Sequence, residues 1–441
     1  MKLNSYLLKA SIVGALGGLL FGFDTAVISG ALNSLSQAFE LSVHAGAFTV
    51  SIALWGTVVG ALTAGLVGQR LGGRNALRIM AVLYIVSSLG CAFAWSWYAL
   101  LVFRFIGGLG IGGSSVLAPV YIAEMAPASL RGRLVGMFQI SVVVGILLAY
   151  FSNYCIARLG MGALEWRWQL GVAAAPAFLF LVMLFGIPQS PRWLATQHRI
   201  EEARNVLKLL RSSDYEEELK DIVDSIHLEK SQGSEPLFSR KLRYPIFVAI
   251  ATGVFNQLAG INAILYYLPS IFQAAGFTKL SGDLQAVAIG AMNLFATLLA
   301  MSLIDKLGRK TLLLIGSAGT ALCLAGVALI FFSQRNQGWL VWILVGYMFF
   351  FAPLGAVIWV YIGEIFPNTV RSKGQGLGSS SHWIMNAIIS YYFPIVAKTS
   401  GAYPFVFFAA MMVLQFFIVS FFYPETKGFT LEEMQHRLGI D

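Results

Sequence analysis

The chain has 441 residues, of which 57% are hydrophobic and 12% are charged, and it carries a net charge of +9. Because a typical soluble domain is about 25% charged, this composition excludes a soluble enzyme, a disordered chain and a disulfide-rich scaffold. The long apolar runs favour membrane helices over a β-barrel, whose strands alternate polar and apolar residues. Net positive charge is typical of basic loops on one side of a membrane, so we expect no nucleic-acid partner.

The apolar residues fall into twelve runs, and most can cross a hydrocarbon core of about 30 Å at about 1.5 Å per residue. The first run follows Lys2 and Lys9 and resembles a signal peptide, but it contains Asp24 and lacks a small-residue cleavage site. We therefore predict an all-α polytopic membrane protein with twelve transmembrane helices. The predicted spans are residues 9–30, 45–68, 79–95, 98–122, 134–157, 168–187, 245–274, 284–304, 311–333, 338–363, 374–397 and 399–423.

The distribution of lysine and arginine predicts the orientation of these spans. With a cytoplasmic N-terminus, only five of the 30 basic residues lie in outer loops, and the opposite orientation would place most of them outside. Because cytoplasmic loops are enriched in Lys and Arg, we expect both termini to be cytoplasmic. The five outer residues are Arg158, Arg167, Lys279, Arg335 and Lys398.

Three sequence patterns recur at nearly one offset, which indicates an internal duplication. The matching segments are 70–74 with 306–310, 121–131 with 361–371, and 188–191 with 424–427. Duplicated halves with a site between them are the construction of secondary transporters. We therefore predict two pseudo-symmetric six-helix bundles, at residues 1–188 and 244–424, joined by a cytoplasmic linker at 189–243 and followed by a cytoplasmic tail at 425–441.

The linker is polar, and two of its stretches are predicted to be helical. Glu201–Leu210 and Tyr215–Lys230 mix charged and apolar residues at helical spacing. We interpret the linker as a solvated connection that contains short amphipathic helices.

Away from the span ends, two charged residues lie inside predicted spans, Asp24 and Arg104. From the span boundaries, Asp24 lies about 8 Å and Arg104 about 9 Å from the outer side. An acid and a base at matching depth predict an ion pair. The pair can be a static contact that fixes packing, or a proton site in which protonation of Asp24 releases Arg104 and shifts the balance of states.

Carboxamides lie near the predicted membrane midplane, where transporter substrates bind. Span seven carries Asn256, Gln257 and Asn262, while Asn293 and Asn386 lie at similar depth on spans eight and eleven. A carboxamide both donates and accepts hydrogen bonds, which suits a ring of hydroxyl groups. Any one of these residues can instead hydrogen-bond a neighbouring helix, so the prediction depends on the set.

Further polar and aromatic side chains extend this set: Gln139, Tyr266, Trp359, His382 and Trp383. Tryptophan faces suit the apolar face of a sugar. His382 can serve as a proton site or as a polar contact, and its position beside Trp383 favours the contact. No acid lies in these spans to balance an anion, so a neutral polyol fits better than an organic acid.

The sequence resembles the sugar porter family of the major facilitator superfamily along almost its whole length. The motifs that carry the resemblance are Gly22-Phe-Asp24, Arg104 before a glycine run, Pro119-Val-Tyr121-Ile-Ala-Glu124, Arg131-Gly132, Pro188-Gln-Ser-Pro-Arg192, Asn256-Gln257-Leu-Ala-Gly260-Ile-Asn262 with Tyr266-Tyr267, Asp305-Lys-Leu-Gly308-Arg309-Lys310, and Pro424-Glu425-Thr-Lys427-Gly428. The resemblance implies two bundles that rock about a central sugar site, without cofactor or bound metal.

The resemblance also implies roles for single residues. Asp24 stands where proton symporters of the family carry aspartate and animal-type facilitators carry asparagine. The family's sugar contacts fall at Gln139, Asn256, Gln257, Asn262, Asn293, Trp359 and Asn386. Its cytoplasmic gating network, which latches that side shut in the outward-facing state, falls at Arg70, Arg74, Glu124, Arg131, Arg192, Asp305, Arg309, Glu364, Arg371 and Glu425.

This sequence departs from the family pattern at five positions. Asn256 replaces a glutamine, and Ala356 stands where a proline is common before Trp359. In the cytoplasmic motifs, Gln69 and Gln189 replace acids and Gly73 replaces an arginine: the N-terminal half has lost acids that the C-terminal half keeps. We hypothesise that the protein populates the inward-facing state more than its relatives do.

We expect a monomeric, multi-pass protein of a bacterial inner membrane. Its expected function is to import a monosaccharide in symport with protons by alternating access. Glucose, galactose, xylose and the polyol inositol all fit the predicted chemistry. A sugar uniporter is the alternative within the same class, and a non-transporting sugar sensor is an alternative from another class. We expect no enzymatic activity, because the sequence offers no nucleophile–base pair or metal-binding set.

Overall fold

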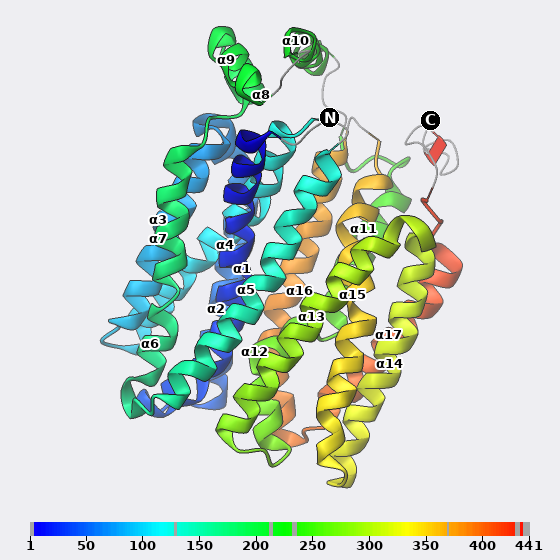
Figure 1. The fold of residues 1–441 in the computed structure, drawn as a ribbon. Helices are drawn as coiled ribbons and strands as arrows, with labels where there is room; N and C mark the ends of the chain where they lie inside the picture. The colour runs from blue at the N-terminus through cyan, green and yellow to red at the C-terminus, as the bar shows by residue number, and fades with distance from the viewer. Residues whose placement is uncertain are drawn as a thin grey trace. The chain divides into compact units, whose positions relative to one another are not determined.

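A computed structural model describes residues 4–127, 130–210, 215–231, 236–367, 370–427 and 433–434 of the chain. These residues form helices joined by short loops, and they include no β-strand (Figure 1). The predicted all-α fold is therefore confirmed for the described part of the chain.

The helices before the linker follow the first six predicted spans. They are α1 (Ser5–Ala38), α2 (Val43–Leu71), α3 (Gly73–Ala92), α4 (Trp97–Met125), α5 (Arg131–Arg158), α6 (Glu165–Gly171) and α7 (Ala174–Met183). The predicted span at residues 168–187 corresponds to one candidate membrane span, Gly162–Gly186, but the helix is interrupted between the end of α6 and the start of α7. Pro176 lies in the first turn of α7 and has no N–H to donate to the carbonyl four residues earlier.

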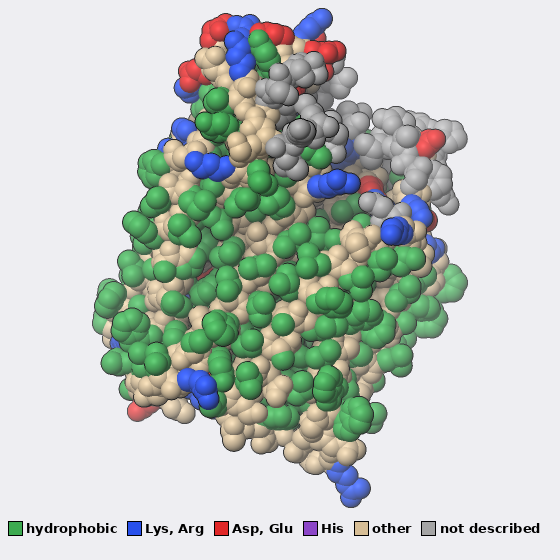
Figure 2. All heavy atoms as spheres, in the orientation of Figure 1, with side chains coloured by type: hydrophobic (Ala, Val, Ile, Leu, Met, Phe, Trp, Pro, Cys, Tyr) green, Lys and Arg blue, Asp and Glu red, His purple; other side chains and the backbone are tan. Residues whose placement is uncertain are grey.

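The linker contains three helices, α8 (Pro191–Thr196), α9 (Ile200–Leu210) and α10 (Tyr215–Ser231). The two predicted linker helices are confirmed to within one residue at each end. The three helices pack on one another, and Figure 2 shows Lys, Arg, Asp and Glu side chains gathered there, whereas hydrophobic side chains cover the membrane helices in the same view.

The helices after the linker follow the last six predicted spans. They are α11 (Arg243–Leu258), α12 (Ile261–Ala274), α13 (Lys279–Leu307), α14 (Arg309–Ser333), α15 (Leu340–Glu364), α16 (Arg371–Thr399) and α17 (Tyr403–Phe422). Among the described residues, eleven helical stretches are long and apolar enough to cross a membrane, and they correspond to eleven predicted spans. The twelfth, α16, has 29 residues and is more polar, with Ser, His and Asn in its middle.

The seventh span is a broken helix, which the sequence analysis treated as continuous. Helix α11 ends at Leu258 and α12 begins at Ile261. Between them Gly260 has a φ of 81°, a conformation that glycine adopts without strain, and the carbonyl of Ala259 accepts a hydrogen bond of 2.8 Å from Tyr347 Oη. Broken helices of this kind present polar backbone and side chains at transporter substrate sites.

The contacts divide the chain into two compact units. Unit 1 consists of residues 1–24, 55–148 and 167–233, and unit 2 of residues 25–54, 149–166 and 234–441. Unit 2 therefore includes the ends of α1, α2 and α5 that the sequence predicts to be extracellular, here called their outer ends. The four predicted domain ranges follow the sequence repeat instead and stay a prediction.

Glycines bring the helices of unit 1 close together. Helix α3 packs on α4 and α7, and α1 crosses α5 where Gly22 faces the backbone of Val142 and Gly145 faces the backbone of Leu19. In unit 2, α11 packs on α16, α13 on α15, and α14 on both α15 and α17. Gly253 on α11 lets that helix approach the backbone of α16 at Gly378.

Candidate functional site

The predicted ion pair is present in unit 1. Arg104 Nη1 of α4 lies 3.2 Å from Oδ1 and 3.4 Å from Oδ2 of Asp24 on α1. The arginine side chain is 4% exposed and the aspartate 17%. A charge as deeply buried as Arg104 requires a counter-charge, because an unpaired one would cost several kcal/mol, whereas the partly exposed carboxylate remains in reach of water.

The pair leaves Arg104 incompletely satisfied. Its Nε is buried and has no hydrogen-bond partner in the described part of the chain, so the contact with Asp24 is made through Nη1 alone. An ion pair that a guanidinium makes through one nitrogen with a partly exposed carboxylate is weaker than a bidentate pair. Protonation of Asp24 would remove the charge attraction that holds the two helices together at this point.

In unit 2 the predicted carboxamides converge on Gln257, which lies one residue before the end of α11. Its Nε2 lies 3.0 Å from His382 Nε2 and 3.5 Å from Asn256 Oδ1, and its Oε1 accepts a hydrogen bond of 3.2 Å from Asn262 Nδ2. The break at Gly260 produces this geometry, because it turns Asn262 back toward the last turn of α11. Gln257 is 1% exposed.

A second hydrogen-bonded group joins α12 to α16. Asn386 Nδ2 donates to Tyr266 Oη at 3.3 Å, and Ser390 Oγ donates to Asn386 Oδ1 at 3.1 Å. Asn386 and Tyr266 are both buried. Tyr150, on the outer end of α5, covers the neighbouring turn of α12 by donating to the carbonyl of Leu265 at 2.7 Å.

Aromatic rings surround the histidine of the first group. The rings of Trp359 on α15 and His382 have centroids 5.2 Å apart, and those of His382 and Trp383 are 5.1 Å apart in an edge-to-face arrangement. Trp359 is only partly buried, whereas Trp383 is 2% exposed. The arrangement therefore offers one partly exposed indole ring beside donors and acceptors, which suits a ligand with a polar rim and an apolar face.

The structure thus brings together eight of the ten predicted binding residues in two hydrogen-bonded or ring-contact groups. Asn293 is buried on α13, and Tyr266 belongs to the second group with Asn386. Gln139 is partly buried on α5 and belongs to unit 1. The roles of all ten stay predictions.

The repeated sequence motifs form equivalent contacts in the two halves of the chain. In unit 1, Tyr121 Oη donates to the carbonyl of Pro188 at 2.7 Å, and Gln189 Oε1 accepts from the backbone N–H of Arg74 at 2.9 Å. In unit 2, Tyr361 Oη donates to the carbonyl of Pro424 at the same distance, 2.7 Å. The sequence duplication is therefore also a duplication of contacts.

Glu425 and Gln189 cap the matching helices α14 and α3. Glu425 accepts hydrogen bonds of 2.9 and 3.0 Å from the backbone N–H groups of Arg309 and Lys310. Among the described residues, Gln189 Oε1 accepts a hydrogen bond from the backbone N–H of Arg74, and its Nε2 donates one of 3.0 Å to the carbonyl of Leu71. The amide of Gln189 thus caps α3 with one accepted and one donated bond, where Glu425 caps α14 with two accepted bonds.

Five of the predicted gating residues have contacts within their own half of the chain. Arg309 forms an ion pair of 2.8 Å with Glu364, and Arg192 Nη1 donates to Ser225 of α10 at 3.3 Å. Arg131 Nε donates to the carbonyl of Ala123 at 3.2 Å. Arg70 is exposed and Arg371 partly buried, Glu124 hydrogen-bonds to Ser190, and the side chain of Asp305 lies outside the described part of the chain.

We expect Gln189→Ala to lower the stability of the protein by about 1–2 kcal/mol, as the loss of a helix cap does. The substitution removes both the acceptor for Arg74 N–H and the donor to Leu71 in a buried place. Thermal inactivation of the purified protein measures the effect. Gln197→Ala, at an exposed glutamine after α8, is the matched control and should change little; equal inactivation of the two variants would contradict the capping role.

Sequence analysis missed a cluster of charges at the outer side of unit 2, in which Glu165 and Asp283 are buried and Lys279 is partly exposed. Lys279 Nζ, at the start of α13, lies 2.6 Å from Glu165 Oε1 at the start of α6. Asp283, one turn further along α13, is 2% exposed and its Oδ2 has no partner among the described residues. These residues lie at span ends, where charges are expected to be solvated, so only the contact between Lys279 and Glu165 and the burial of Asp283 distinguish them.

The comparison with known families and proteins agrees with this architecture. A family model described as "Sugar (and other) transporter" matches residues 10–438. The chain is 34% identical over 475 residues to the D-xylose-proton symporter of Escherichia coli (strain K12), and the alignment covers 98% of this chain and 96% of that protein. It is 35% identical over 438 residues to the arabinose-proton symporter of Bacillus subtilis (strain 168), with 98% and 94% covered.

Solved structures are similar over the same length. An inward-open structure of the xylose transporter XylE from E. coli has a TM-score of 0.88 and 33% identity, and the match covers 98% of this chain and 100% of that one. The structure of the proton:xylose symporter XylE bound to 6-bromo-6-deoxy-D-glucose has a TM-score of 0.82 and 33% identity, with 98% and 99% covered. The predicted twelve-helix major facilitator fold is thereby confirmed.

Proposed function

Since this chain belongs to the family of sugar transporters, we propose that it imports a monosaccharide, a hexose or pentose, in symport with protons by alternating access. The ion pair between Asp24 and Arg104 carries the proton part of this proposal. It combines a buried base with a carboxylate that water can reach, at a depth where both lie inside the membrane. The relatives named as proton symporters support the same function.

In this mechanism Asp24 takes up a proton from the outer side. The neutral acid no longer attracts Arg104, so the free energy difference between the outward- and inward-facing states changes. Return of the carboxylate to its charged form on the inner side restores the pair and resets the carrier. The carrier changes between its outward- and inward-facing states only when proton and sugar are both bound or both absent. The proton gradient is therefore converted into a sugar gradient.

The sugar-binding part of the proposal uses the two carboxamide groups of unit 2. In the absence of sugar their donors and acceptors satisfy one another, as in Gln257 with His382 and Asn386 with Tyr266. Sugar hydroxyls would replace these contacts one for one, while Trp359 would stack on the ring. Asn293 would add a contact from α13, and the role of Gln139 in unit 1 stays a prediction.

We also propose that both termini and the linker face the cytoplasm, in a bacterial inner membrane, as the distribution of Lys and Arg indicates. The capped helix ends at Gln189 and Glu425 then lie on the cytoplasmic side. There the gating residues would latch that side in the outward-facing state, and we propose that the protein works as a monomer.

The proposal is tested by sugar-induced alkalinisation of lightly buffered, energy-depleted cells that express the protein, across hexoses, pentoses and inositol. Alkalinisation with one sugar, abolished by a protonophore, is the expected result and names the substrate. Counterflow of a labelled sugar without any pH change would identify a uniporter and return the ion pair to a structural role. The absence of both alkalinisation and counterflow for every solute tested would contradict the proposal that the protein is a sugar transporter.

We expect Gln257→Ala to raise the KM for the transported sugar by about tenfold, because a lost hydrogen bond to a neutral partner costs about 0.5–1.5 kcal/mol and His382 is left unpaired. Initial rates of labelled-sugar uptake measure this. The control is Gln37→Ala, at an exposed position near the end of α1. An unchanged KM in the Gln257 variant would exclude this group from sugar binding.

A further inference from the structure

Away from the residues of the candidate site, the turn that leads into α11 forms a small basic hollow on unit 2. Backbone hydrogen bonds close the turn, including one of 3.2 Å from Leu242 N–H to the carbonyl of Ser239, and buried Leu242 anchors it. The hollow has a volume of about 240 Å³ and is lined by Phe238, Ser239, Arg240, Arg243 and Ile246.

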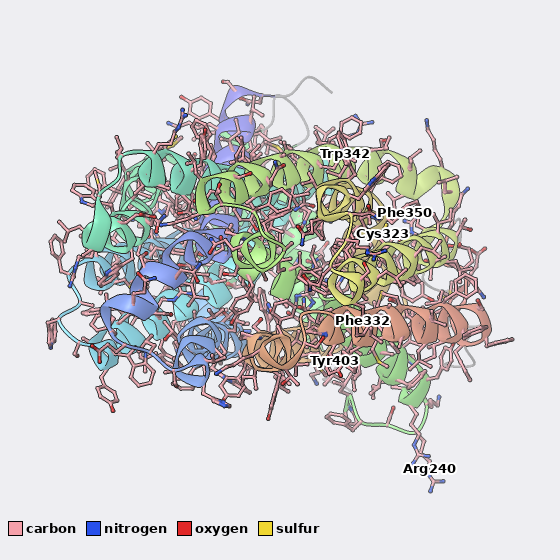
Figure 3. All side chains as sticks on the ribbon, turned by 90° about the horizontal axis from the view of Figure 1, so that it is seen from below. Arg240, Cys323, Phe332, Trp342, Phe350 and Tyr403 are labelled. Carbon is pink, nitrogen blue, oxygen red and sulfur yellow. The ribbon has the colours of Figure 1, made fainter. Side chains whose placement is uncertain are left out.

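The two arginines of the hollow offer their guanidinium groups to solvent. Both side chains are exposed, and neither has a hydrogen bond or ion pair within the described part of the chain; in Figure 3 Arg240 extends away from the ribbon. The segment from Pro236 to Phe255 contains no acid. The acids Glu364 and Glu425 of unit 2 are already bonded, to Arg309 and to backbone N–H groups.

An apolar face continues from the hollow along α11. Phe247 and Ile250 follow Arg243 at spacings of four and seven residues, so the three side chains share one face of the helix. Phe247 is 46% exposed and Ile250 is 36% exposed. Helix α17 widens this face, because the rings of Phe247 and Phe422 pack 6.3 Å apart and Tyr244 Oη donates to the carbonyl of Phe422.

We propose that this surface binds an anionic glycerophospholipid, with the phosphodiester between Arg240 and Arg243 and an acyl chain along Phe247 and Ile250. Guanidinium groups bind phosphate through paired hydrogen bonds, and basic residues beside a membrane helix attract anionic headgroups. Free phosphate offers the same charge but nothing for the apolar face. The proposal does not depend on which solute the protein carries.

Native mass spectrometry of the detergent-purified protein tests this with phosphatidylglycerol, phosphatidylcholine and inorganic phosphate as separate probes. We expect preferential retention of phosphatidylglycerol over phosphatidylcholine. Since a basic residue near an anionic surface contributes about fivefold in affinity, Arg240→Gln with Arg243→Gln should weaken retention by about tenfold or more. The doubly substituted protein should fold, since both residues are exposed on a surface turn.

The matched control removes two charges elsewhere, by Arg335→Gln with Lys398→Gln, at exposed positions of other loops and helix ends. It should retain phosphatidylglycerol like the unsubstituted protein. Equal retention by both double variants, or equal retention of the two lipids by the unsubstituted protein, would overturn the proposal. Full displacement of the lipid by millimolar inorganic phosphate would also overturn it, since the site would then recognise phosphate alone.

Discussion

Asp24→Asn is expected to abolish accumulation of sugar against its gradient while leaving equilibrative exchange active. One proton that crosses 100 mV releases about 2.3 kcal/mol, which supports about a fiftyfold concentration ratio. Asparagine cannot take up and release a proton, so this energy is no longer coupled and the ratio falls to one. Its carbonyl oxygen can still accept a hydrogen bond from Arg104 Nη1, the contact seen in the structure at 3.2 Å.

The measurement compares two assays on the same vesicles: uptake driven by an imposed pH gradient, and counterflow of labelled sugar at equal pH. Driven accumulation should be lost and counterflow should persist. Asp221→Asn, at an exposed aspartate of α10, is the control for the same chemical change and should keep both activities. An Asp24 variant that still accumulates sugar would show that the ion pair only fixes packing.

A variant that loses both activities needs a further measurement, since an unbalanced Arg104 can destabilise the fold. Removing one partner of a buried pair costs about 3–5 kcal/mol, and Arg104 Nε has no hydrogen-bond partner in the described residues. Asp24→Glu keeps the charge and separates the cases. A folded glutamate variant that transports would confirm that the carboxylate, and not only its hydrogen bond, is required.

The sequence alone was sufficient to predict those features that depend only on position along the chain or along a helix axis. Depth along a helix axis follows from residue number, so the pairing of Asp24 with Arg104 could be predicted from two spans alone. Helix existence and the internal duplication likewise follow from apolar run length and from repeated motifs. The linker helices α9 and α10 could be located because their charged and apolar residues alternate with helical period.

The remainder depends on which faces of distant helices meet, and the sequence does not encode that locally. Gln257 and His382 are 125 residues apart and contact each other only because α11 packs on α16. The break at Gly260 was missed because one glycine within an apolar run is compatible with a continuous helix. Glu165 and Lys279 were missed because charges at span ends are ordinarily solvated.

Gly22→Ala is expected to prevent stable folding of the protein. A Cβ atom at this position would lie 1.8 Å from the carbonyl oxygen of Val142 and 3.1 Å from the backbone nitrogen of Ile146. Both atoms belong to the backbone of α5, so no rotation of a side chain relieves the overlap and the two helices must separate. Overpacking costs about 1–3 kcal/mol even where side chains can adjust, and we expect at least the upper value here.

The reciprocal glycine strengthens the argument. A Cβ at Gly145 of α5 would lie 2.1 Å from the carbonyl oxygen of Leu19 on α1, so the crossing requires a glycine on each helix, as close helix pairs in membranes do. Gly22 precedes Asp24 by two residues. The close approach of α1 to α5 leaves no room for a side chain at position 22. It therefore fixes the position of α1 two residues before Asp24, the candidate proton-binding residue.

The yield of monodisperse protein in detergent and its thermal inactivation rate measure the effect. Gly65→Ala on α2 is the matched control, because a Cβ there would meet no atom within 4 Å. Alanine favours a helix over glycine by about 1 kcal/mol, so the control should be unchanged or slightly more stable. A Gly22 variant as stable as the control would mean that α1 and α5 can separate without loss of the fold, and the close crossing would then not be what holds Asp24 in register with Arg104.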